Sequence, residues 1–389
     1  MKAISDKNLY DWNTIRGGNT NQNNAKVNFS AKGVINWKYL LDSNAENNSL
    51  LVAGNNIIIV NSTELIIINE LNGQLASKVE GDFKEAIISW NQKIITLEDK
   101  GKVLRIRNIP DGKIENECSI NSPFWHSITQ DNKGNLLCFN RTAKGLFLDI
   151  FETDTLTKRG SIEVQKNNIY LPIFNESSVL MPAGNCIRGL DTNWNLEWQA
   201  GVSFFSTNIA NSLDNHKVCA PLILLDTKTL LTTFLLDAGN KVYIVIDSEK
   251  ETTHILPIPE TCVIAPSTTY AVSTGLKFHT IGYHNQKRHI FSINLEGTLL
   301  WKFPLDFDTE YIISDHSGKI ILAQNPPIEQ WNLYRDAYEL HDKCSVKIID
   351  DKGELLFSIP TNAPVKSNFA IGKSGKLFFI ADKKIWAIS

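Results

Sequence analysis

The chain of 389 residues has no long apolar run and no excess of either charge. Its longest apolar stretches, such as 57–60 and 65–68, are far shorter than the roughly 20 residues that cross a bilayer as a helix, so we predict no membrane span. It carries 39 Lys and Arg against 42 Asp and Glu. Because a nucleic-acid-binding face needs a clear Lys/Arg excess, this balance argues against nucleic acid as a partner.

Cysteine is scarce and widely spaced. The six cysteines form neither a dense disulfide framework nor a metal-binding spacing, so we expect buried, reduced thiols. The first seven residues, Met-Lys-Ala-Ile-Ser-Asp-Lys, have no apolar core of a signal peptide. We therefore predict a cytoplasmic protein, with an exported mature form as the open alternative.

Helical periodicity is also missing, and short β-branched and aromatic runs bounded by Gly, Asn, Asp and Lys take its place. One unit has strands predicted at 49–56, 57–62, 64–69 and 74–79, with an Asn72-Gly73 turn before the last strand. Asn-Gly suits a tight hairpin because both central positions of a type I′ turn need a positive φ. Each unit is therefore predicted to be an up-and-down sheet of four strands.

Eight such units cover the chain. The eighth is one strand short, and the segment 34–41 has the pattern of the missing strand. An isolated four-stranded sheet leaves both faces wet, whereas radial packing covers them and pairing of the two chain ends protects a free edge. We predict one all-β domain over 1–389, an eight-bladed β-propeller closed by the N-terminal strand, with blades at 49–82, 83–122, 123–165, 166–202, 216–259, 261–306, 307–361 and 363–389 plus 34–41.

The outermost strands share an aromatic position, occupied by Trp37, Trp198, Trp301 and Phe357. We expect these rings to wedge between adjacent blades, where a large aromatic side chain buries much apolar area.

These motifs resemble a known family. Asp-Trp-Asn-Thr-Ile-Arg-Gly-Gly-Asn at 11–19, Gly-Thr-Leu-Leu-Trp at 297–301 and Lys-Ile-Trp-Ala-Ile at 384–388 resemble segments of the PQQ-like (quinoprotein-like, BamB-like) β-propellers. The resemblance covers nearly the whole chain and implies the propeller shape. The quinone dehydrogenases of that family use two adjacent cysteines, which this chain lacks, together with a calcium site that has no recognisable counterpart here. We therefore expect no PQQ site and no cofactor.

Propeller channels are lined by the innermost strands, and the starts of these strands carry the candidate site. Aromatic walls with a few polar groups suit small-molecule pockets. His126 has the chemistry of a general base, and Glu85 or Glu310 could orient it or act as an acid. The plainer alternative is that these polar groups only hold water. The aromatic members of the expected channel mouth are Trp125, Tyr170, Phe205 and Tyr311.

The seventh unit contains an insertion at 325–343, much longer than an ordinary hairpin loop of roughly 2–5 residues. A short helix after Pro327 would place Trp331, Tyr334 and Tyr338 on one face, with Arg335 beside them. The insertion is either a packing cap or a lid that binds a partner.

Two apparent motifs are not supported. His279, His284 and His289 suggest a metal cluster, but a turn at 284–287 pairs Gly282 with His289 and His279 with Ser292, which places His279 and His289 on opposite faces of the sheet. Gly372-Lys373-Ser374 looks like the end of a phosphate loop, but no helix pattern follows, so we predict a β-turn.

The sequence thus favours a non-redox binding or scaffold module, which presents its aromatic channel mouth to a protein partner or a small hydrophobic or aromatic ligand. The alternative is a cofactor-independent lyase, cyclase or transferase that uses His126 with Glu85 or Glu310. We expect no metal site.

Overall fold

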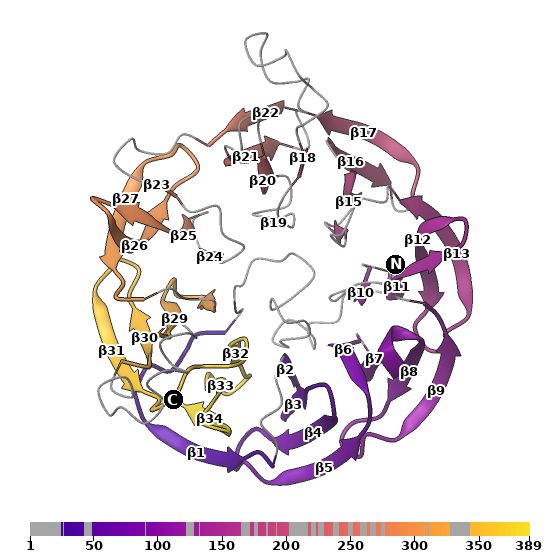
Figure 1. Ribbon diagram of the computed structural model, residues 1–389, viewed down its shortest axis with the longest axis horizontal. Coiled ribbons are helices and arrows are strands. Elements are labelled where there is room, and N and C mark those ends of the chain that lie inside the picture. Colours follow the sequence, from indigo (N-terminus) through magenta and orange to yellow (C-terminus); the bar gives the residue numbers. More distant parts are fainter. Residues whose placement is uncertain are drawn as a thin grey trace.

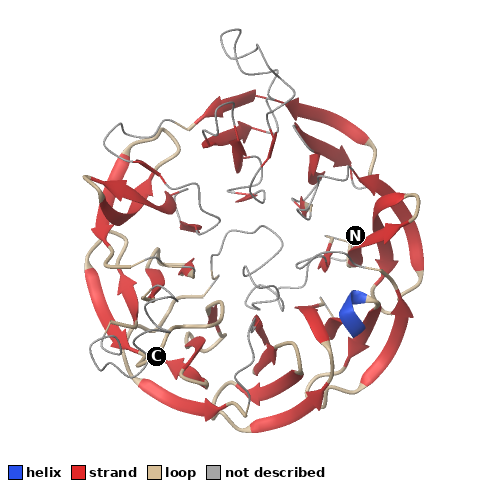
Figure 2. Ribbon diagram, in the orientation of Figure 1, coloured by secondary structure: helices blue, strands red, loops and turns tan. Residues whose placement is uncertain are grey.

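The computed structural model describes residues 25, 27–42, 49–89, 91–121, 128–131, 133–164, 172–174, 178–183, 186–191, 193–201, 217–218, 223–224, 229–235, 241–247, 252–256, 263–264, 270–273, 277–307, 309, 311–326 and 343–389. Within these ranges the regular structure is β-strand apart from one 3-10 turn, Asp99–Gly101 (Figure 2). The chain is therefore all-β where it is described, as its strand patterns predict.

The described strands form eight separate antiparallel sheets, numbered here in chain order. In the first four, consecutive strands pair as neighbours. Sheet 1 contains β2 (Ser49–Ala53), β3 (Asn56–Val60), β4 (Glu64–Asn69) and β5 (Leu75–Glu80); sheet 2 contains β6 (Phe83–Ile88), β7 (Ile94–Glu98), β8 (Val103–Arg107) and β9 (Ile114–Ser119); sheet 3 contains β10 (Ile128–Gln130), β11 (Asn135–Thr142), β12 (Gly145–Glu152) and β13 (Lys158–Val164); sheet 4 contains β14 (Ile173–Phe174), β15 (Ser178–Ala183), β16 (Cys186–Asp191) and β17 (Leu196–Gly201).

Sheet 7 keeps this plan, whereas sheets 5, 6 and 8 depart from it in two ways. In sheets 5 and 6 the first position holds two short strands that pair with the same neighbour, and in sheet 8 the last position is taken by β1. Sheet 5 contains β18 (Lys217–Val218), β19 (Ile223–Leu224), β20 (Thr229–Leu235), β21 (Lys241–Asp247) and β22 (Thr252–Ile255); sheet 6 contains β23 (Val263–Ile264), β24 (Tyr270–Ser273), β25 (Lys277–His284), β26 (Lys287–Ile293) and β27 (Leu299–Pro304); sheet 7 contains β28 (Ile312–Ser314), β29 (Ile320–Gln324), β30 (Ser345–Ile349) and β31 (Leu355–Pro360); sheet 8 contains β32 (Ala370–Ile371), β33 (Leu377–Ala381), β34 (Lys384–Ile388) and β1 (Ile35–Leu40).

The sheets lie around a common axis, each with its first strand towards the centre and its last strand on the rim (Figure 1). Strands such as β3 and β4 are buried along almost their whole length, whereas every residue of the rim strand β5 is exposed or half-buried. This gradient is what radial packing produces, because inner strands are covered on both faces by neighbouring sheets.

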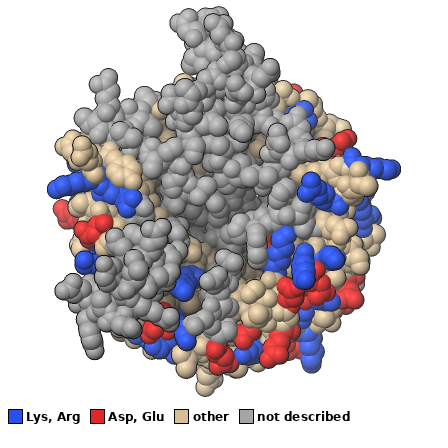
Figure 3. Space-filling view, in the orientation of Figure 1, with Lys and Arg blue, Asp and Glu red and all other residues tan. Residues whose placement is uncertain are grey.

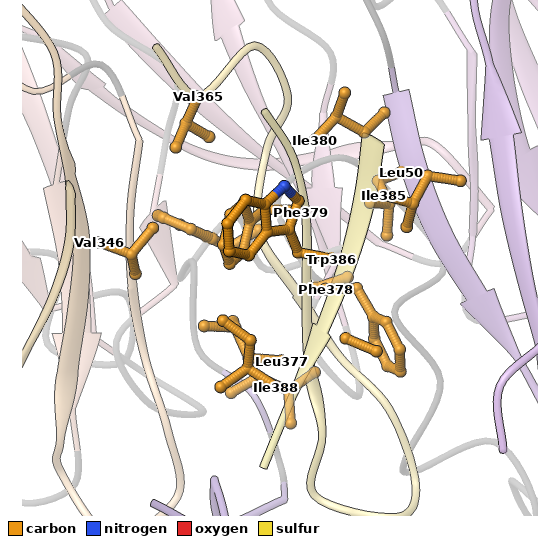
Figure 4. Packing of buried hydrophobic residues seen from close by; sticks show 14 of the residues in the cluster. Leu50, Val346, Val365, Leu377, Phe378, Phe379, Ile380, Ile385, Trp386 and Ile388 are labelled. Atoms are coloured by element: carbon orange, nitrogen blue, oxygen red, sulfur yellow. The ribbon is translucent and has the colours of Figure 1, made fainter. Parts of the chain in front are cut away.

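The N-terminal segment pairs with the C-terminal strand, as the pattern at 34–41 predicts. Tyr39 lies opposite Ile385 in the β1–β34 ladder, and the backbones of Val34 and Ser389 exchange two hydrogen bonds of 3.0 and 2.9 Å. Figure 4 shows the resulting core, in which the side chains of sheet 8 pack between Val346 of sheet 7 and Leu50 of sheet 1.

Residues just before β1 hold sheets 7 and 8 together. The amide of Phe29 donates to Oδ2 of Asp315 at 2.9 Å, and the amide of Ser30 donates to the carbonyl of Gly375 at 3.0 Å. Both Phe29 and Asp315 are buried. This segment therefore joins turns of two neighbouring sheets through the backbone as well as through an apolar anchor.

Two of the expected aromatic anchors bridge neighbouring sheets. The indole N–H of Trp37 donates to the carbonyl of Glu70 at 3.1 Å, and that of Trp301 donates to the carbonyl of Asp351 at 3.0 Å. Each ring covers a turn glycine with positive φ, Gly73 and Gly353, where a Cβ would lie 2.7 and 2.9 Å from the indole.

The other two anchors differ. Phe357 lies against Gly33, 3.2 Å from the position of a Cβ there, so it anchors the segment that precedes β1. Trp198 instead covers Gly189, its cross-strand partner in sheet 4. Its ring takes the space that the missing glycine side chain leaves within the sheet.

Candidate functional site

Most residues of the predicted channel mouth lie outside the described part of the chain. This applies to Trp125, His126, Tyr170, Phe205, Glu310, Trp331, Tyr334, Arg335 and Tyr338. Glu85 and Tyr311 are described. Glu85 lies within the inner strand of sheet 2 and Tyr311 directly precedes that of sheet 7, and sheets 8 and 1 lie between these two sheets (Figure 1).

Glu85 lies in β6, opposite Leu97, with 5% of its surface exposed. Its neighbour Lys84 is half-buried, and burial lowers the pKa of that ammonium, while the charge of Glu85 acts in the opposite direction. Both charges also act on the buried thiol of Cys138 in sheet 3, whose pKa is raised chiefly by burial and then by Glu85. Glu85 and Lys84 are therefore close to the boundary between sheets 2 and 3.

Tyr311 precedes β28 and is half-buried against the apolar core around sheet 8. Its carbonyl accepts hydrogen bonds from the amide of Ala323 at 3.1 Å and from the hydroxyl of Thr309 at 3.0 Å. This environment gives Tyr311 a packing role at the start of sheet 7.

The three histidines of sheet 6 have the predicted register. His279 lies opposite Ser292, and Gly282 lies opposite His289. His279 is fully buried, its ring stacks on Trp301 with centroids 5.4 Å apart, and burial lowers its pKa to about 3. Over the described ranges, no group of three or more His, Cys, Asp or Glu side chains is placed to hold a metal ion.

The Gly372–Ser374 segment is a β-turn, as predicted, and it receives an anion from the protein itself. The amide of Ser374 donates to Oε1 of Glu70 at 3.0 Å, and the Ser374 hydroxyl donates to the same oxygen. Glu70 is 1% exposed. Its carboxylate, from the end of β4, thus ties sheet 1 to the β32–β33 turn of sheet 8.

A second buried carboxylate, Glu98, holds two arginines within sheet 2. Its oxygens accept hydrogen bonds from Nε and Nη2 of Arg107 at 2.7 and 2.9 Å and from Nη1 of Arg105 at 2.5 Å. Burial alone would raise the pKa of Glu98, but these bonds, with one from Thr96, hold it below its usual range. A single Glu at the end of an apolar strand was the available sequence signal, because carboxylates are rarely fully buried unless paired.

A third buried carboxylate, Asp149, is one of the residues that line a cavity on sheet 3. It accepts hydrogen bonds from Nδ2 of Asn140 at 2.6 Å and Oγ of Ser161 at 2.5 Å, and its Oδ1 lies 2.7 Å from Nζ of Lys158. The cavity has a volume of about 430 Å³. Its lining comprises the turn residues 142–144, Phe147, Asp149, Lys158 and Ser161.

The face in Figure 3 carries both signs of charge around its rim, with Lys and Arg interspersed among Asp and Glu. Among the described residues of this face, such mixing produces no broad field of one sign. In the described portion of the chain, no helix is both long and apolar enough to cross a bilayer.

Comparison with known proteins relates the fold to solved structures. No family model and no curated protein matches the chain. A quinohemoprotein alcohol dehydrogenase, ADHIIG from Pseudomonas putida HK5, is similar with a TM-score of 0.61 and 9% identity, over 96% of this chain and 76% of that chain. The computationally designed protein Ika8 is similar with a TM-score of 0.57 and 10% identity, over 90% of this chain and 98% of that chain. At identities this low, structural similarity shows the fold alone. The fold that it shows is a PQQ-like propeller.

Proposed function

We propose that the eight sheets are the blades of a single closed propeller, and that this ring is a cytoplasmic binding or scaffold module without redox chemistry. Closure is supported by the ladder between β1 and β34 and by the Trp37 contact with sheet 1. The location is supported by Cys118 and Cys138, which are free thiols.

The observation that supports the binding role is that the buried carboxylates make structural contacts. Glu70 joins sheets 1 and 8, Asp315 receives the segment before β1, and Glu98 pairs with Arg107. Each of these carboxylates is almost completely buried and fixes backbone or a neighbouring side chain. These carboxylates make structural contacts that keep the sheets in fixed positions. A rigid framework of this kind can present binding residues at a constant spacing, as a scaffold does.

The proposed binding surface is the channel mouth, formed by the starts of the inner strands around Trp125, His126 and Tyr170 and by the insertion that carries Trp331. Its occupant is a protein partner or a small aromatic or hydrophobic ligand. Propellers leave these positions free to vary because the packing between sheets holds the ring.

One observation favours the alternative of a cofactor-independent enzyme. Lys84, with its lowered pKa, and the buried Glu85 are adjacent at the start of an inner strand. A perturbed ionisable group such as Lys84 in such a place is typical of acid–base sites. In that case His126 would be the base, with Glu85 or Glu310 as its partner.

The test incubates the protein with a mixture of small aromatic acids, alcohols and amines, and then compares the bound and free compounds by mass spectrometry over time. A binding module retains compounds unchanged and loses this retention in Trp125→Ala. Time-dependent conversion that disappears in both His126→Ala and Glu85→Gln, with the circular dichroism spectrum preserved, would overturn the binding role in favour of the enzyme.

A further inference from the structure

The cavity at Asp149 exists because sheet 3 departs from a row of long side chains that six other sheets share. In seven sheets the ladder between the third strand and the rim strand contains a register irregularity. Counted along the third strand, the cross-strand pair two residues before the shifted residue occupies an equivalent position in each of these sheets. Outside sheet 3, each of these pairs contains at least one long side chain. They are Ile66–Lys78, Arg105–Glu117, Arg188–Gln199, Phe291–Lys302, Lys347–Ser358 and Trp386–Lys38.

Sheet 3 has the short pair Asp149 and Ser161 at this position. Where contacts are known in the other sheets, the long side chains fill the space: Nζ of Lys38 lies 3.3 Å from the centroid of the Trp386 ring, and Nε of Arg105 binds Glu117 at 2.9 Å. Two short side chains cannot fill the same volume, so a cavity of about 430 Å³ remains.

The charged residues that line the cavity favour an anionic ligand, because two lysines, Lys144 and Lys158, accompany one carboxylate, Asp149. Asp149 is the buried acceptor, and it already has Asn140, Ser161 and Lys158 as partners. An ammonium has three donors, and Lys158 uses one of them on Asp149, while its side chain is 47% exposed. Lys144 is exposed at the edge of the same cavity. Both lysines therefore have N–H donors left, and a ligand carboxylate can accept hydrogen bonds from them.

One wall of the cavity is aromatic. Phe147 lies two residues before Asp149 on β12, so both side chains point to the same face, and Phe147 is half-buried. Glu163, opposite Phe147 in the ladder, is exposed, so water screens its charge. A ring stacked on Phe147 would cover apolar surface while its carboxylate reaches the lysines.

From this arrangement we infer that the Asp149 cavity is a second ligand site, which binds a small aromatic carboxylate between Lys144 and Lys158 with its ring against Phe147. The site lies on sheet 3 and stands independently of the channel mouth, so either proposal can fail without the other.

The test measures by calorimetry, at low salt, the binding of three probes that share a phenyl ring: benzoate, benzyl alcohol and benzylamine. We expect benzoate to bind with a Kd of about 1 mM or tighter and the other two to bind at least about tenfold more weakly. Lys144→Gln and Lys158→Gln should each weaken benzoate by about tenfold, because each removes one charged donor. Lys352→Gln, an exposed lysine on the turn of sheet 7, is the matched control and should leave the Kd unchanged.

Three results would overturn the inference. They are no heat of benzoate binding up to about 10 mM, benzylamine binding as tightly as benzoate, and a benzoate Kd unchanged in both lysine variants. Inorganic phosphate is the remaining probe. If phosphate binds as tightly as benzoate, the aromatic part of the ligand assignment is wrong, and if it binds more weakly, the role of Phe147 is supported. Phe147→Ala should then bring the benzoate affinity down towards that of phosphate.

Discussion

Glu98 illustrates how single charged side chains stabilise this molecule. It is 1% exposed and stays ionised because Arg107, itself 4% exposed, binds both of its oxygens. A buried ion pair of this kind adds little net stability over an apolar pair, but loss of one partner leaves the other charge buried and unpaired.

We therefore expect Glu98→Gln to lower the free energy of unfolding by about 3 kcal/mol in urea titrations. The control is Glu117→Gln, because Glu117 also binds Arg105 but its side chain is 57% exposed. That change should cost less than about 1 kcal/mol. Equal losses in the two variants would contradict the assigned role of burial.

His279 predicts a pH dependence. Its folded-state pKa of about 3 lies below the unfolded value of roughly 6.5, so between these limits the unfolded state binds one more proton. Its contribution to stability is therefore complete above pH 6.5 and declines as the pH falls, with a slope of up to about 1.4 kcal/mol per pH unit until the folded pKa is reached.

The measurement is the free energy of unfolding between pH 5 and 7. His279→Gln should flatten the slope in this window, because glutamine does not titrate there. A wild-type slope that His279→Gln leaves unchanged would show that other groups cause the acid sensitivity.

At the scale of strands and turns, a contact between an aromatic ring on a rim strand and a glycine in a neighbouring turn recurs in the molecule. Gly353 has φ +90°, and a Cβ there would lie 2.9 Å from the Trp301 ring. Gly54 also has a positive φ, +57°, but a Cβ there would lie 3.8 Å from its nearest neighbour, Oε1 of Gln92. The two positions separate the cost of backbone conformation from the cost of a steric clash.

Gly54→Ala should lower the free energy of unfolding by about 1 kcal/mol, the usual cost of an alanine in the left-handed region. Gly353→Ala should cost about 1–3 kcal/mol more, because it also displaces Trp301 from its neighbouring turn. Equal costs in thermal or urea unfolding would mean that the indole moves aside freely and is not an anchor.

The ladder between β1 and β34 joins the N-terminal segment to the C-terminal strand, and the proposed closure predicts that the stability of the whole molecule depends on this pairing. We expect a circular permutant, opened at the exposed Asn285-Gln286 turn and joined from Ser389 to Ala25 by a flexible Gly/Ser linker, to fold with the wild-type circular dichroism spectrum. The same permutant without residues 34–41 should lose cooperative unfolding, because β34 then becomes a free edge over an exposed core. A cooperative transition in both would contradict closure by β1.

The sequence was most informative where the determining interactions are local. Alternation of apolar residues and turn residues such as Asn72-Gly73 predicted the strands of sheet 1 to within a few residues, and the turn at 284–287 predicted the β25–β26 register. A unit of four strands predicts one inner strand in sheet 6, but the structure pairs β25 with two short strands, β23 and β24. A long strand can accept two partners in succession, and no local pattern reveals that choice.

Local pattern also predicted the order of the sheets along the chain and the pairing of the segment 34–41 with the C-terminal strands, because strand periodicity and turn chemistry depend on near neighbours in sequence. Only the folded molecule brings Ser374 to Glu70, which is 304 positions away, or leaves an empty volume beside Asp149. Such contacts depend on which sheets become neighbours and how far each side chain reaches between them, and these properties arise from packing in three dimensions.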